Sequence, residues 1–122
     1  MKSIIYLESE DIENGILKPY VTQDNTKYII LLCMASWCGF CKQMLPAYEK
    51  LAMMPHENFV VCALKADGDE SEKQAFKDNI KIWDSNFKGF PSVYAFGKDG
   101  KIIKPYNGNR DENSLLVFMK SL

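Results

Sequence analysis

The sequence has no excess of positive charge and no long hydrophobic run. Its 122 residues carry a formal net charge of -1 at pH 7, and the lysines are scattered along the chain rather than clustered. Nucleic acids are usually bound through a basic face, so we expect no nucleic-acid partner. A transmembrane helix needs about 20 consecutive apolar residues. No run in the sequence approaches that length, so we also expect no membrane partner.

The chain also lacks internal repeats, low-complexity tracts and recognisable linkers. A length of 122 residues suits one compact domain, so we predict a single domain over residues 1–122 that works as a monomer. The amino terminus has no signal-peptide core, because the apolar run at residues 4–7 is short and the sequence turns acidic at Glu8. We therefore expect a cytoplasmic protein.

Four cysteines without a secretory signal argue against a structural disulfide framework and favour redox or metal chemistry. Cys33 and Cys62 lie within apolar runs, where a free cysteine usually behaves as a small buried hydrophobe. We expect these two cysteines to be packing residues. Cys38 and Cys41 instead follow the end of an apolar run, which makes them the candidates for chemistry.

Short apolar runs alternate with helix-like stretches along the chain, which predicts an α/β domain. We expect strands at residues 3–7, 27–34, 58–66, 92–96 and 101–104. We expect helices at residues 9–19, from residue 38 onward, at residues 71–82, and after Asp111, which can cap the last helix. The Asp-Gly pair within residues 97–100 predicts a hairpin turn between the last two strands.

Cys38 and Cys41 have the Cys-x-x-Cys spacing and stand where a strand gives way to a helix. Backbone N–H groups at a helix N-terminus have no partner within the helix, and together with the helix dipole they favour a thiolate on the first cysteine. The thiolate is the attacking species in disulfide exchange. We therefore predict that Cys38 is the nucleophile and that Cys41 resolves the mixed disulfide.

The same Cys-x-x-Cys spacing also supplies half of many zinc sites, so a structural metal is the alternative to weigh. The remaining candidate ligands are Cys33, Cys62 and the single histidine, His56. Two of these lie in expected buried strands and His56 lies in an expected turn, so we predict no metal site. Disulfide exchange also needs no bound cofactor, because the electrons pass through the sulfurs themselves.

The two cysteines belong to a wider set of residues, namely Trp37-Cys38-Gly39-Phe40-Cys41-Lys42, Pro46 and Gly89-Phe90-Pro91. This set resembles the thioredoxin family, and the likeness spans nearly the whole chain. The resemblance implies a thioredoxin-like α/β fold, with a mixed central sheet flanked by helices on both faces. It also implies that Pro91 is a cis-proline that packs beside the disulfide.

The resemblance further implies a surface that presents a partner's cysteine to the active site. Its expected members are Trp37, Gly39, Phe40, Phe90, Pro91 and Gly108. Large apolar groups beside a reactive thiol exclude water and grip an extended peptide. The partners implied are disulfide-containing protein substrates, together with a reductase or a thiol pool that recycles the domain.

Two departures from the family pattern concern proton transfer and redox potential. Thioredoxins usually carry a buried acid six residues before the first cysteine and a lysine on the neighbouring strand, where this chain has Leu32 and Ala63. Phe40 stands where the family commonly has proline or histidine. These departures do not fix the direction of exchange. From the cysteine pair and the resemblance we predict a thiol-disulfide oxidoreductase that acts on protein substrates as a reductant. Isomerase or oxidase activity, and a binding module without redox turnover, stay open as alternatives.

Overall fold

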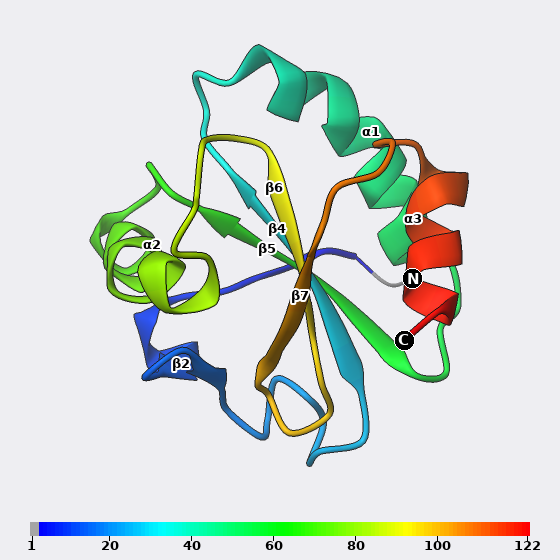
Figure 1. The fold of residues 1–122 in the computed structure, drawn as a ribbon, viewed down its shortest axis with the longest axis horizontal. Helices are drawn as coiled ribbons and strands as arrows, with labels where there is room; N and C mark the ends of the chain where they lie inside the picture. Colours follow the sequence, from blue (N-terminus) through cyan, green and yellow to red (C-terminus); the bar gives the residue numbers. More distant parts are fainter. Residues whose placement is uncertain (1–2) are drawn as a thin grey trace.

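The structure, a computed structural model, describes residues 3–122 and is built around a five-stranded sheet (Figure 1). The strand order is β1-β5-β4-β6-β7. The strands are β1 (Ile5–Tyr6), β4 (Tyr28–Met34), β5 (Phe59–Lys65), β6 (Ser92–Phe96) and β7 (Ile102–Tyr106). The pairs β1/β5 and β4/β5 are parallel, whereas β4/β6 and β6/β7 are antiparallel, so the sheet is mixed as expected.

The central strand β4 is buried on both faces, which explains its nearly continuous apolar sequence. Successive side chains of a strand point to opposite faces. Leu31 and Cys33 accordingly join the core on one side of the sheet, whereas Leu32 and Met34 join the core on the other side. This alternation places the residue six positions before Cys38 on the same face as the cysteine pair.

Three helices cover the sheet: α1 (Gly39–Met53), α2 (Glu70–Trp83) and α3 (Glu112–Lys120). Helices α1 and α3 pack on one face and α2 packs on the other, as Figure 1 shows. Asp111 caps α3 by accepting a hydrogen bond from the backbone N–H of Ser114 at 2.8 Å. None of the helices in the described residues 3–122 has the length and hydrophobicity to cross a membrane.

The helix that we predicted at residues 9–19 is wrong. The segment instead forms a short 3-10 turn, η1 (Ser9–Asp11), followed by a small antiparallel hairpin of β2 (Ile12–Glu13) and β3 (Ile16–Leu17). Asn14 and Gly15 form the two-residue turn, with positive φ values of 52° and 80°. An Asn-Gly pair is a strong signal for this kind of turn.

The position of this hairpin is fixed by side chains of α2. Asn79 is buried, and its Oδ1 accepts a hydrogen bond from the backbone N–H of Gly15 at 2.9 Å. The indole Nε1–H of Trp83 donates to the backbone oxygen of Gly15 at 2.7 Å. Helix α2 therefore satisfies the polar backbone groups at the turn, and this contact favours the hairpin over a helix.

Candidate active site

The dithiol lies at the carboxyl end of β4 and at the start of α1. Cys38 is the N-cap residue of α1, and its Sγ accepts a hydrogen bond from the backbone N–H of Cys41 at 3.2 Å. Both cysteines are free thiols, with exposed fractions of 5% for Cys38 and 2% for Cys41. The helix N-terminus therefore directs a donor at the first sulfur, and access to either sulfur from solvent is narrow.

The pKa of Cys41 is raised to about 11, first by burial and then by its interaction with the Cys38 thiol. A hydrogen bond to the backbone of Ala35 and the positive charge of Arg110 act in the opposite direction and lower this pKa. Cys41 is therefore protonated at neutral pH, and it must lose a proton before it can attack a mixed disulfide.

An apolar pair lies on the sheet behind the dithiol. Leu32 of β4 is paired in register with Ala63 of β5, and both side chains are fully buried. They belong to the same core cluster as Cys38 and Cys41. The two positions that carry an acid and a lysine in most thioredoxins are therefore neighbours here, and neither can accept a proton from Cys41.

Two exposed aromatic side chains flank the cysteine pair. Trp37 is 70% exposed and Phe40 is 62% exposed. The Trp37 ring meets the half-buried ring of Phe90 edge to face, with centroids 5.6 Å apart. Phe90 in turn packs against Phe76 and Phe87, at centroid distances of 5.4 Å and 5.2 Å. The aromatic surface beside Cys38 is thus anchored in the core beneath α2.

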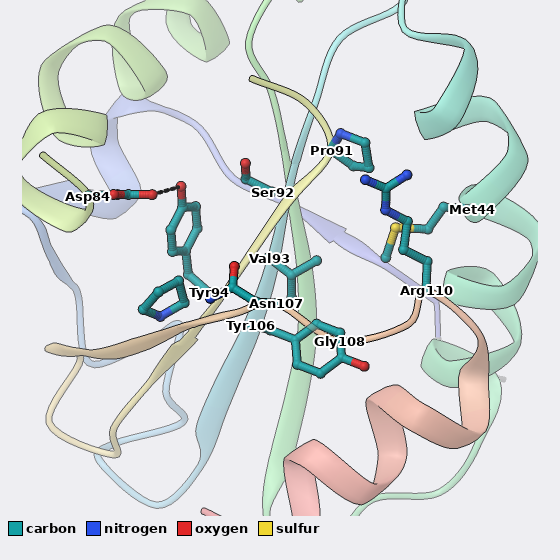
Figure 2. A pocket seen from close by; sticks show the side chains of 11 residues that line it. Met44, Asp84, Pro91, Ser92, Val93, Tyr94, Tyr106, Asn107, Gly108 and Arg110 are labelled. Carbon is teal, nitrogen blue, oxygen red and sulfur yellow. Dashed lines mark hydrogen bonds between the residues drawn. The ribbon is translucent and has the colours of Figure 1, made fainter. Parts of the chain in front are cut away.

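The Phe90–Pro91 peptide bond is cis, as the family resemblance implied. Pro91 lines a cleft of about 210 Å³ together with Gly108 and Met44 (Figure 2). A Cβ at Gly108 would collide with the ring and hydroxyl of Tyr106, so a larger residue there would have to displace the Tyr106 side chain. At Gly39 there is free space instead: a Cβ at that position would meet no atom within 4 Å, so a side chain there would not clash.

Arg110 is a residue of this site that the sequence reasoning missed. Its guanidinium carbon lies 5.4 Å from the centre of the Phe40 ring, and its side chain lines the same cleft as Pro91. Its charge also lowers the pKa of Cys41. One signal for it was present in the sequence, because the only arginine of the chain stands two residues after Gly108.

Asp67 is a second residue that the sequence reasoning missed. Its carboxylate accepts a hydrogen bond from the backbone N–H of Ser36 at 3.0 Å and another from the Ser36 hydroxyl. These bonds also lower the pKa of the Asp67 carboxyl. These hydrogen bonds fix the position of Ser36 in the loop between β4 and the dithiol, which also contains Trp37.

Cys33 and Cys62 are fully buried in the core on the opposite face of the sheet from Cys38 and Cys41. Burial raises the pKa of both thiols. The prediction that they lie buried in strands is confirmed. Because the sheet separates the two pairs, Cys33 and Cys62 cannot complete a four-cysteine zinc site with the dithiol.

A mixed sheet with helices on both faces, a Cys-x-x-Cys pair at the start of α1 and a cis-proline together define a thioredoxin-like fold with a dithiol site. The sequence model of the family described as Thioredoxin matches residues 12–121. The chain belongs to the thioredoxin family.

Curated relatives of this chain carry the name of protein disulfide isomerase. Protein disulfide isomerase-like 1-1 of Arabidopsis thaliana is 32% identical over 94 residues, which are 76% of this chain and 18% of the relative. Protein disulfide-isomerase of Ricinus communis is 31% identical over an alignment of 124 positions that covers 93% of this chain and 23% of the relative. The chain thus spans about a fifth of the length of these relatives.

Solved structures share the fold at lower sequence identity. Thioredoxin f from spinach chloroplast superposes with a TM-score of 0.68 at 18% identity, and the match covers 98% of this chain and 93% of that protein. The Trx4 domain of ERdj5 superposes with a TM-score of 0.68 at 17% identity and covers 99% of this chain and 96% of that domain.

Proposed function

We propose that this chain is a thiol-disulfide oxidoreductase that exchanges its Cys38/Cys41 dithiol with disulfides of protein substrates. The observation that carries the proposal is the placement of a free dithiol at the N-terminus of α1, next to the exposed Trp37. The Trp37 ring in turn contacts Phe90, which forms the cis bond with Pro91. Trp37, Phe40, Phe90, Pro91 and Gly108 supply the surface on which the substrate lies.

In the first step the Cys38 thiolate attacks one sulfur of the substrate disulfide. The substrate S–S bond breaks, a Cys38–substrate disulfide forms, and the released substrate thiolate takes a proton from solvent. The N–H donor of Cys41 and the positive end of α1 stabilise negative charge on the Cys38 sulfur.

In the second step the Cys41 thiol loses its proton and its sulfur attacks Cys38. The mixed disulfide breaks, the Cys38–Cys41 disulfide forms, and the second substrate sulfur leaves and is protonated. Two electrons and two protons have then passed to the substrate. Because burial keeps the pKa of Cys41 high, loss of its proton is the demanding event of this step.

For the direction of exchange we propose that the domain works as a reductant, which a reductase or a thiol pool then recycles. The names of the relatives favour a second candidate, in which the same chemistry serves protein disulfide isomerisation or oxidation. Equilibration of the couple with glutathione distinguishes the two. A potential near that of thioredoxin, about -270 mV, supports the reductant, whereas a value near about -180 mV supports the isomerase.

Reduction of insulin by dithiothreitol tests the proposed activity. The parent chain should accelerate the reaction, and Cys38→Ser should abolish the acceleration. Cys41→Ser should attack once and then stall, so that mixed disulfides with the substrate accumulate and dissolve when reductant is added. If the parent chain gives no acceleration, the chain is a binding module of the thioredoxin fold instead. Equal trapping by Cys38→Ser would contradict the division of roles.

A further inference from the structure

The cleft lined by Pro91, Gly108 and Arg110 also reaches a carboxylate that the exchange reaction does not use. A hollow of about 510 Å³ adjoins the cleft of about 210 Å³, and the two share Asp84, Pro91, Ser92, Pro105, Asn107 and Arg110 among their lining residues. Figure 2 shows Arg110 and Asp84 on opposite sides of this groove, with Pro91 and Ser92 between them. The groove therefore has a cationic end next to Phe40 and an anionic end at Asp84.

The Asp84 carboxylate is held in a defined position at the end of α2. One oxygen accepts a hydrogen bond from the hydroxyl of Tyr94 at 2.9 Å, and the other accepts from the backbone N–H of Asn86 at 3.0 Å. Tyr94 is fully buried, so this side chain anchors the carboxylate from the protein interior. Each carboxylate oxygen can accept a further hydrogen bond.

The Asp84 carboxylate makes no direct salt bridge with a neighbouring residue in the described part of the chain. Lys88 lines the larger hollow together with Asp84, whereas Arg110 lines both hollows and lies over the Phe40 ring. The Arg110 guanidinium therefore marks the end of the groove next to Phe40, and the Asp84 carboxylate marks the opposite end.

We propose that Asp84 is a specificity-determining site that binds a lysine or arginine side chain of the protein substrate. This inference rests on the proposed function. An extended substrate segment that leaves Cys38 along the groove advances about 3.3 Å per residue. A basic side chain on this segment is repelled at the Arg110 end and attracted at the Asp84 end. The preference for a basic side chain should therefore appear only at those substrate positions whose distance from the cysteine places the side chain at Asp84.

A purely structural role for Asp84 would have different consequences. In that case the carboxylate would serve only to accept hydrogen bonds from Tyr94 and Asn86, and its charge would be irrelevant to the substrate. Asp84→Asn separates the two roles, because the amide keeps an acceptor oxygen of similar shape and removes the charge. Tyr94→Phe makes the complementary change, because it removes the anchoring hydroxyl and keeps the charge.

The test uses peptides that each contain one cysteine, bonded through a disulfide to a thionitrobenzoate reporter. Arginine, alanine or glutamate is placed in turn at each of the five positions on either side of the cysteine. For the parent chain we expect arginine to raise kcat/KM over alanine by about three- to fivefold at one or two neighbouring positions, mainly through KM. Glutamate at the same positions should lower kcat/KM. Added salt should reduce both effects.

The ratio of kcat/KM for the arginine and alanine peptides should fall to about one in Asp84→Asn. It should persist in Tyr94→Phe and in the control Asp78→Asn, which removes a charge from the exposed surface of α2. A parent ratio of one at all positions, or an unchanged ratio in Asp84→Asn, would overturn the inference. Parent turnover of the alanine peptide shows separately whether the proposed redox function holds.

Discussion

Replacement of Leu32 by aspartate introduces a buried acid behind the dithiol. It tests the effect of such an acid on folding stability and on the step in which Cys41 resolves the mixed disulfide. Leu32 is fully buried against the core that holds Cys38 and Cys41, with Ala63 beside it on β5. Removal of a buried leucine side chain costs about 3 to 5 kcal/mol, and burial of a carboxyl in its place adds to that cost. The total stability of a domain of this size is about 5 to 15 kcal/mol, so we expect a folded but weakened variant.

The loss of stability in Leu32→Asp should depend on pH. Burial disfavours the charged carboxylate, so the pKa of the new carboxyl should rise by about two units above its unfolded value of about 4. The folded state then binds the proton more tightly than the unfolded state. The variant is consequently most stable below about pH 4, and it should lose about 3 kcal/mol as the pH rises through about 6.

Urea unfolding of Leu32→Asp and of Leu32→Asn between pH 4 and 8 measures this effect. Leu32→Asn is the matched control, because it suffers a similar packing loss but cannot titrate. The difference in unfolding free energy between the two variants should grow with pH. A difference that stays constant over this range would mean that water reaches position 32 and solvates the carboxylate, which would refute the reasoning.

The same variant should also change the resolution step. A carboxyl with a raised pKa can exchange a proton with Cys41 near neutral pH, which neither Leu32 nor Ala63 can do. Stopped-flow release of a mixed disulfide should therefore become faster in the folded Leu32→Asp protein, with a pH dependence that Leu32→Asn lacks. Identical pH profiles for the two variants would show that removal of the Cys41 proton does not limit this step.

Three further outcomes are expected. Arg110→Gln should raise the pKa of Cys41 further, because it removes a positive charge that lowers this pKa. The pH at which mixed-disulfide release accelerates should therefore move upward. Arg110→Lys keeps the positive charge and should reverse part of this change. Cys33→Ala and Cys62→Ala should each cost about 1 to 2 kcal/mol in urea unfolding. Both should keep insulin reduction, and loss of activity in a folded variant would point to a second redox pair. Asn79→Ala should cost about 1 to 3 kcal/mol, because it leaves the buried backbone N–H of Gly15 in the β2–β3 turn without a partner. Hydrogen exchange should show that turn opening first.

The sequence was sufficient to predict the elements that carry the dithiol. A buried strand is recognisable from its continuous apolar run, and α1 is recognisable from apolar residues at helical spacing behind Cys41. Both signals are local, and the structure places β4 (Tyr28–Met34) and α1 (Gly39–Met53) where they were expected. The helix expected at residues 9–19 does not form because Asn14-Gly15 adopts a hairpin turn with positive φ at both residues. The contact with α2 that decides in favour of the hairpin comes from far along the chain.

The charges of the groove could not be predicted in the same way, because charged residues in loops have no periodicity that reveals their position. Asp84 follows α2 and Arg110 precedes α3, and the β6–β7 hairpin separates them in the sequence. The register of that hairpin pairs Val93 with Tyr106, and this pairing brings the segments on either side of it to the same end of the sheet. The position of Arg110 beside the dithiol therefore depends on strand pairing, and so does its distance from Asp84. The family resemblance, which rests on the cysteines and Pro91, is enough to locate the site of exchange. The charges along the groove lie on loops of this chain, and their positions can be determined only from the three-dimensional structure.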